Sequence, residues 1–129
     1  MIRAFVFDLD GTLVETEGLK ALSYARAATE LRPDLDEQEV VAAFGDLVGL
    51  SRQEVAADLM RHFGLEGAAQ ARMAEFGVST PWQAYVQIRL SIYEGLLGDL
   101  RLIREHRYPH NIALLRDARR EGFLTALAT

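Results

Sequence analysis

The chain begins Met1-Ile2-Arg3-Ala4-Phe5-Val6-Phe7-Asp8-Leu9-Asp10-Gly11-Thr12-Leu13, and this stretch decides the fold. An apolar run, residues 4–7, ends directly in two carboxylates and a Gly-Thr turn. A short apolar run bounded by turn residues predicts a buried strand of a parallel sheet. In open α/β sheets, ligands bind at the carboxyl ends of such strands. We therefore expect Asp8 and Asp10 to lie at the rim of a sheet.

Two carboxylates this close together suit phosphoryl transfer. One can attack phosphorus as a covalent nucleophile, and the other can donate a proton to the leaving oxygen and later accept one from water. Two like charges repel unless a cation compensates, and Mg²⁺ usually binds through one or two carboxylates plus a substrate phosphate. Gly11 permits backbone torsions that a Cβ atom would block. The Thr12 hydroxyl can hydrogen-bond nearby backbone and fix the turn.

Residues 7–13, Phe-Asp-Leu-Asp-Gly-Thr-Leu, resemble the first motif of the haloacid dehalogenase-like (HAD) superfamily, in its phosphatase and phosphomutase branch. The resemblance implies that Asp8 becomes an aspartyl phosphate and also binds Mg²⁺. It implies that Asp10 is the general acid/base, with its backbone carbonyl on the metal, and that N–H groups near Leu9 and Asp10 hold phosphate oxygens. Asp10 disfavours carbon–halogen cleavage, because the dehalogenases of this superfamily lack an Asp there. The alternative is a buried strand followed by a purely structural turn.

Beyond residue 16, apolar residues recur mostly at helical spacing. We expect helices at about 19–31, 36–47, 51–63, 66–76, 81–97 and 111–121, while 100–107 fits either a helix extension or a separate turn. Residues 123–129 predict a second apolar strand. A helix, a glycine and a strand that ends in a hydroxyl residue resemble the second HAD motif, in which a Ser or Thr hydrogen-bonds the transferring phosphate. By position, Thr129 is that residue.

The order of strand, helices and strand predicts an α/β fold with a very long crossover between parallel strands. With the resemblance, it implies the N-terminal part of a Rossmann-like HAD core, residues 1–15 plus about 100–129, and an inserted α-helical cap domain at about 16–99. The third and fourth motifs of the superfamily, a Lys and an acidic cluster that completes the Mg²⁺ site, are absent. We therefore expect this chain to be part of a longer enzyme and inactive alone.

Arg52 is a candidate substrate contact. It follows Ser51, which predicts the N-cap of a helix with Glu54 completing a capping box. The stretch resembles the cap loop of HAD phosphosugar mutases and phosphatases, which carries an Arg for the distal part of the substrate. A guanidinium matches a phosphate or a carboxylate bidentately. An exposed Arg in the first turn of a capped helix, with no ligand, remains the alternative.

The composition excludes several classes of function. The net charge of −5 disfavours nucleic acid as a partner, and the absence of cysteine excludes disulfides, thiol catalysis and Cys-based metal sites. The three histidines show no ligand spacing and are expected at surface or cap positions. No apolar run is long enough for a membrane helix or a signal peptide, so we expect a soluble, cytoplasmic protein.

The sequence thus predicts Mg²⁺-dependent hydrolysis of a small phosphorylated metabolite through an aspartyl phosphate. Alternatives are a phosphosugar mutase with the same nucleophile, and a non-catalytic interaction module. Substrate identity and oligomeric state are not predicted.

Overall fold

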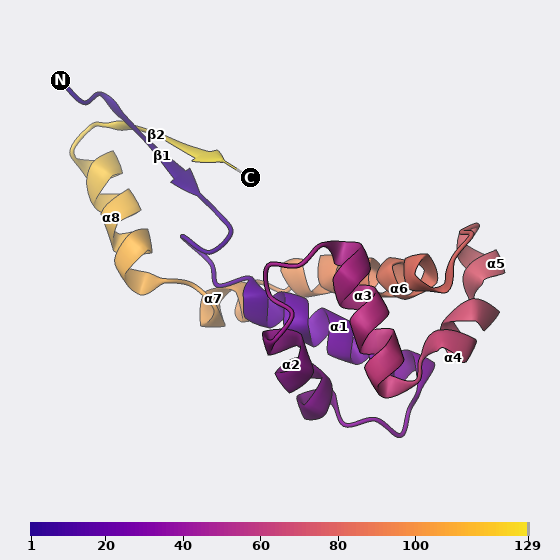
Figure 1. The fold of residues 1–129 in the computed structure, drawn as a ribbon. Coiled ribbons are helices and arrows are strands. Elements are labelled where there is room, and N and C mark those ends of the chain that lie inside the picture. The colour runs from indigo at the N-terminus through magenta and orange to yellow at the C-terminus, as the bar shows by residue number, and fades with distance from the viewer. Residues whose placement is uncertain (129) are drawn as a thin grey trace. The chain divides into compact units, whose positions relative to one another are not determined.

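The computed structural model describes residues 1–128 as a mixed α/β protein that is mostly helical (63%), with a small two-stranded parallel sheet (Figure 1). The elements are β1 (Ala4–Asp8), α1 (Glu17–Leu31), α2 (Glu37–Gly45), α3 (Arg52–Phe63), α4 (Glu66–Ala71), α5 (Met73–Phe76), α6 (Pro81–Leu97), α7 (Leu100–Glu105), α8 (Pro109–Arg120) and β2 (Leu124–Ala128). The coarse α/β prediction is confirmed, whereas the HAD core stays a prediction.

The chain divides into two compact units. The sheet unit comprises Met1–Glu17 and Asp99–Thr129, and the helical unit comprises Gly18–Gly98. That these units act as a catalytic core and its cap stays a prediction.

In the sheet unit, β1 and β2 run parallel, in a register that pairs Phe7 with Leu127 and Asp8 with Ala128. Alternate residues of a strand point to opposite faces, so one face of β1 is buried. Phe7 forms a small core with Leu13 and Val14, against which Ile112 and Leu115 of α8 pack. The parallel pairing of the two predicted strands is confirmed.

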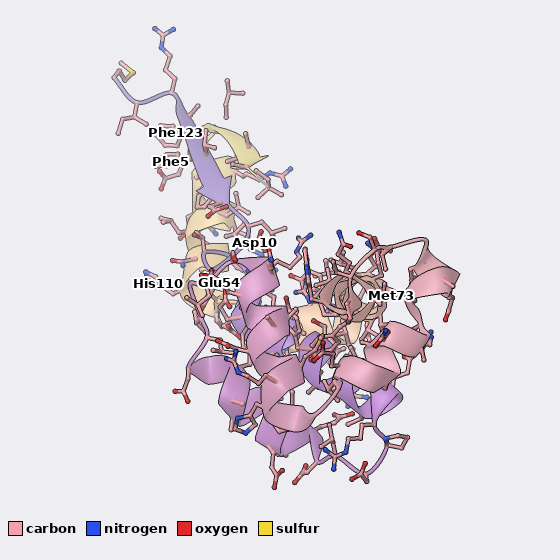
Figure 2. The ribbon with its side chains drawn as sticks, turned by 45° about the vertical axis from the view of Figure 1, so that its right-hand side comes forward. Phe5, Asp10, Glu54, Met73, His110 and Phe123 are labelled. Atoms are coloured by element: carbon pink, nitrogen blue, oxygen red, sulfur yellow. The ribbon has the colours of Figure 1, made fainter. Side chains whose placement is uncertain are left out.

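The rings of Phe5 and Phe123, labelled in Figure 2, meet edge to face, with centroids 5.2 Å apart. Such aromatic pairs contribute about 0.5–1.5 kcal/mol beyond their buried area. The contact joins β1 to the residue that precedes β2. It therefore helps to hold the first strand beside a segment more than a hundred residues later in the chain.

In the helical unit, apolar side chains of α1, α2, α3, α4 and α6 form one core. Tyr24 stacks on Phe44 at 5.5 Å between ring centroids and meets Tyr85 edge to face at 5.7 Å. Tyr85 is fully buried, and its hydroxyl donates to the carbonyl oxygen of Tyr24 at 3.0 Å. Burial raises the pKa of Tyr85 far above its usual value, so this hydroxyl stays protonated.

Local capping explains where the helices begin and end. The Glu54 N–H donates to Ser51 Oγ at 3.2 Å, and the Ser51 N–H donates to Glu54 Oε2 at 2.9 Å, so the predicted capping box of α3 is confirmed. Gly64 ends α3 with a φ of 66°, in the left-handed region that favours glycine. Pro81 occupies the first position of α6, where its missing N–H costs no hydrogen bond.

Two predicted helix ranges are wrong. The predicted helix 66–76 is two short helices, α4 and α5, interrupted at Arg72. The last helix starts at Pro109 rather than Asn111, because proline suits a first helical position. The Asn111 side chain instead donates a hydrogen bond to the Thr12 carbonyl oxygen. The undecided segment 100–107 contains a helix of its own, α7, whose N-cap Asp99 accepts from the Arg101 N–H at 2.9 Å. Within residues 1–128, no helix has the length and apolar character needed to span a membrane.

Candidate active site

Asp8 and Asp10 lie at the carboxyl end of β1. Asp8 is the last residue of the strand, and Asp10 follows in the loop, where Figure 2 labels it. Both side chains are exposed. The structure therefore brings the two predicted catalytic carboxylates to one end of the sheet, while the predicted role of Thr129 falls outside the described residues.

The loop after Asp8 is closed by its own backbone. The carbonyl oxygen of Leu9 accepts from the N–H groups of Thr12, Leu13 and Val14, at 3.4, 3.1 and 3.1 Å. The Gly11 N–H donates to the Val14 oxygen at 2.8 Å. Gly11 has a φ of 73°, and a Cβ atom there would meet no heavy atom within 4 Å, so glycine is required for its torsion and not for space.

A second set of bonds ties this loop to the segment before α8. Asn111 Nδ2 donates to the Thr12 carbonyl oxygen at 2.7 Å, and the Tyr108 N–H donates to the Leu13 oxygen at 2.9 Å. Among the described residues, the Thr12 hydroxyl makes no side-chain hydrogen bond. The turn is thus held by backbone hydrogen bonds and by the Asn111 side chain. The Thr12 hydroxyl, which we expected to fix it, does not do so among the described residues.

Sequence reasoning missed Asn111 as a positioning residue. Its side chain amide can satisfy a carbonyl 99 positions away only after α8 has packed on the sheet. The sequence offered one signal, an asparagine next to a proline-started helix, and that signal also fits a cap. Only the folded structure shows that Asn111 holds the loop and does not act as a helix cap.

The two backbone N–H groups expected to hold phosphate differ in their availability. The Leu9 N–H donates to the Ala128 oxygen at 3.1 Å and so continues the strand pairing. Among residues 1–128, the Asp10 N–H has no hydrogen-bond partner. A phosphate contact at Asp10 is therefore compatible with this conformation, while one at Leu9 requires sharing an existing bond; both stay predictions.

The donor set suits a hard cation. Asp8 and Asp10 offer only carboxylate oxygens, which Mg²⁺ prefers, together with the Asp10 carbonyl. In the described part of the chain, no group of three or more acidic or histidine side chains gathers as a metal site. These two residues therefore fit as part of a Mg²⁺ shell, with water, substrate phosphate or further ligands filling the other positions.

Arg52 lies in the helical unit as the first residue of α3, and it is exposed. It lines a cavity of about 520 Å³ whose apolar wall includes Trp82 and Leu90. Within residues 1–128, no ion pair involving Arg52 is found. It is thus placed as an exposed cation beside a cavity, and its role as a substrate contact stays a prediction.

Arg89 on α6 is another arginine of the helical unit, and no sequence pattern singles it out. It is only 5% exposed, and its guanidinium lies over the rings of Tyr24 and Tyr93, at 4.7 and 4.6 Å from their centroids. Its Nε donates to Ser23 Oγ at 2.8 Å. Burial lowers the pKa of Arg89, although an arginine this basic stays charged.

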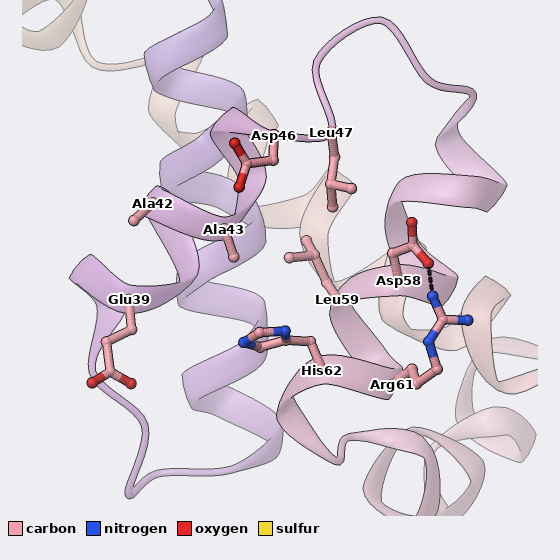
Figure 3. Close-up of a pocket in the computed structure, with 9 residues that line it drawn as sticks. All are labelled: Glu39, Ala42, Ala43, Asp46, Leu47, Asp58, Leu59, Arg61 and His62. Carbon is pink, nitrogen blue, oxygen red and sulfur yellow. Dashed lines mark hydrogen bonds and ion pairs between the residues drawn. The ribbon is translucent and has the colours of Figure 1, made fainter.

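A groove between α2 and α3, shown in Figure 3, is another cavity of the helical unit, at about 680 Å³. Its walls carry the acidic side chains Glu39, Asp46 and Asp58, the last of which is paired with Arg61. His62 at its edge is exposed, as is His110, and His106 caps the C-terminus of α7. The predicted surface or cap placement of the histidines is confirmed, and none lies among the described residues in a metal cluster.

Comparison with known proteins adds no assignment. No protein-family model matches this chain, and a search of the curated proteins finds no match either. The case for a function therefore depends on the motif at residues 7–13 and on the geometry around it.

We expect Gly11→Ala to destabilise the loop between Leu9 and Val14. A non-glycine residue in the left-handed region costs about 1–2 kcal/mol, so the Leu13 and Val14 amides should exchange roughly 5–30 times faster with solvent. The measurement is native-state hydrogen exchange. Gly95→Ala is the matched control, because Gly95 lies within α6 and a Cβ there would meet no atom within 4 Å. It should leave the loop amides unchanged, and unchanged amides in Gly11→Ala itself would contradict the torsional role.

Proposed function

We propose that this chain carries the nucleophile and the acid/base of a HAD-type phosphatase that hydrolyses a small phosphorylated metabolite with Mg²⁺. The observation that carries the proposal is the pair of exposed carboxylates, Asp8 and Asp10, at the carboxyl end of a parallel strand. Ligands bind at this place in open α/β sheets. The closed loop and its bond to Asn111 support the proposal, because reacting groups must be held in a fixed geometry.

In the proposed reaction, a carboxylate oxygen of Asp8 attacks the phosphorus of a phosphate monoester. The bond from phosphorus to the ester oxygen breaks, and protonated Asp10 gives its proton to the departing alcohol. Asp10, now a carboxylate, then takes a proton from water as the water oxygen attacks the aspartyl phosphate. Inorganic phosphate leaves, and Asp8 and Asp10 return to their starting states.

Bound Mg²⁺ would neutralise charge on the phosphoryl oxygens. Asp8, through its carboxylate, and Asp10, through its backbone carbonyl, would hold the ion. The Asp10 N–H is available to one phosphoryl oxygen in the conformation described. The resemblance further implies a Lys and an acidic cluster that complete such a site, and we propose that a protein containing them in addition to this chain is the active enzyme.

The test is phosphate release from an aryl phosphate, measured on this chain and on the full product of its gene. We expect activity that is lost when EDTA removes divalent cations and regained with Mg²⁺ but not with Ca²⁺, because Ca²⁺ tolerates a looser, larger coordination shell. A rate that is indifferent to EDTA would contradict the metal part of the proposal. Absence of phosphate release from the full product, across sugar phosphates, phosphoglycolate and nucleotides, would contradict the proposal as a whole.

A phosphosugar mutase is the second candidate, favoured by one observation. Arg52 is an exposed cation beside a cavity, as a residue that holds a second phosphate should be. A mutase would interconvert hexose 1- and 6-phosphates, would need a bisphosphate primer and would release little inorganic phosphate. Steady release without a primer would favour the phosphatase.

A further inference from the structure

The groove between α2 and α3 combines an acidic wall with an apolar floor. The α2 wall is formed by residues at positions i, i+3, i+4 and i+7, which share one helical face: Glu39, Ala42, Ala43 and Asp46 (Figure 3). The half-buried Leu47 and the buried Leu59 add to the apolar lining. The wall therefore presents two carboxylates about 10 Å apart along the helix axis, with small apolar side chains between them.

The carboxylates of Glu39 and Asp46 are not neutralised by the protein. Both residues are exposed, and among residues 1–128 neither carboxylate has a hydrogen-bond or ion-pair partner. Asp46 is also the C-cap residue of α2, where a carboxylate lies at the negative end of the helix dipole. Its charge gains nothing from its own helix, so helix stability does not explain its position.

The α3 wall does not compensate this negative charge. Asp58 is paired with Arg61, whose side chain points away from α2 in Figure 3. The exposed ring of His62 lies in the gap between the two helices. The groove thus keeps the charges of Glu39 and Asp46 beside its apolar floor. Such a surface is complementary to a segment that carries both positive charge and an apolar side chain.

We propose that this groove binds a basic, amphipathic helix of a partner protein. Two Arg or Lys side chains of that helix, about two turns apart, meet Glu39 and Asp46. An apolar side chain between them packs on Ala43 and Leu59. A third helix can lie along the groove between two others, and docking of an amphipathic helix in this way is a common mode of recognition. These residues all lie in the helical unit, so the proposal does not depend on the chemistry proposed for Asp8.

The experiment titrates the complete chain with a synthetic helical peptide of about 18 residues. The peptide carries two arginines seven positions apart and two leucines midway, in a sequence otherwise made of alanine and glutamine. The readout is the backbone amide NMR spectrum of the chain at constant ionic strength. We expect saturable shifts confined to residues 39–47 and 58–62. Peptides with glutamate in place of arginine, or alanine in place of leucine, should each bind several-fold more weakly.

Variants of the chain separate a local site from general charge. Glu39→Gln combined with Asp46→Asn should weaken binding of the arginine peptide roughly three- to tenfold, as expected for the loss of two exposed ion pairs. Glu66→Gln combined with Glu94→Gln is the matched control, because it removes two exposed carboxylates of the same unit outside the groove and should leave binding unchanged. Glu39→Lys combined with Asp46→Lys should reverse the preference, so that the glutamate peptide binds more tightly than the arginine peptide.

Three results would overturn the proposal. The arginine peptide could give no saturable shift, or all three peptides could bind equally well, which would leave neither charge nor apolar contact as a determinant. Alternatively, the same amides could shift when the chain is concentrated without peptide. That result would show that a second copy of the chain, and not a separate partner, occupies the groove.

Discussion

Replacing Asp8 by Asn is expected to abolish formation of the phosphoryl-enzyme and to lower the phosphatase rate at least about 10⁴-fold. The amide has nearly the same size as the carboxylate, but its oxygen is a poor nucleophile and carries no charge for Mg²⁺. Asp8 is exposed at a strand end, so the substitution should not disturb the small core around Phe7. The measurements are steady-state phosphate release and intact mass after acid quenching, which preserves an acyl phosphate.

Asp117→Asn is the matched control for this substitution. It removes an exposed carboxylate of the same sheet unit that pairs only with Arg120 on the surface of α8. Surface pairs of this kind contribute little, so rate and fold should both be unchanged. Phosphoryl adduct in Asp8→Asn at the level of the unaltered protein would show that another residue is the nucleophile.

The placement of the carboxylates could be predicted from the sequence because it depends on local chemistry. An apolar run that ends in Asp-Leu-Asp-Gly-Thr indicates both the strand and the loop, and the structure shows β1 ending at Asp8. Gly11 adopts the positive φ for which only glycine is well suited. Each of these features depends on residues within a few positions of one another.

The features that could not be predicted depend on contacts between distant segments. The bond from Asn111 to the Thr12 carbonyl exists only once α8 is packed on the sheet. Arg89 is similar, because its aromatic stack joins α6 to Tyr24 of α1. A single arginine in an amphipathic helix gives no sign that it will be buried. Helix breaks such as Arg72 also escape prediction, since no glycine or proline marks them.

Asp10→Asn is expected to have a smaller but more informative effect than Asp8→Asn. Loss of a general acid typically lowers a rate by about 10²–10⁴-fold, and the loss depends on how much the leaving oxygen needs a proton. Hydrolysis of an alkyl phosphate should therefore fall by that amount. Phosphorylation of Asp8 by an aryl phosphate should fall much less, because a phenolate departs without help.

The same variant should also reveal the second half of the reaction. Without Asp10 to take a proton from water, the aspartyl phosphate formed from an aryl phosphate should accumulate, giving a burst of phenol followed by slow turnover and a stable mass increase on Asp8. Asp10→Glu keeps the carboxyl group but moves it by one methylene, and should restore part of the turnover. The structure allows a competing role for Asp10, as a carboxylate that only orders the loop between Leu9 and Val14. In that case alkyl and aryl phosphates would lose rate equally and no phosphoryl-enzyme would build up, so the two substrates together decide between proton transfer and positioning.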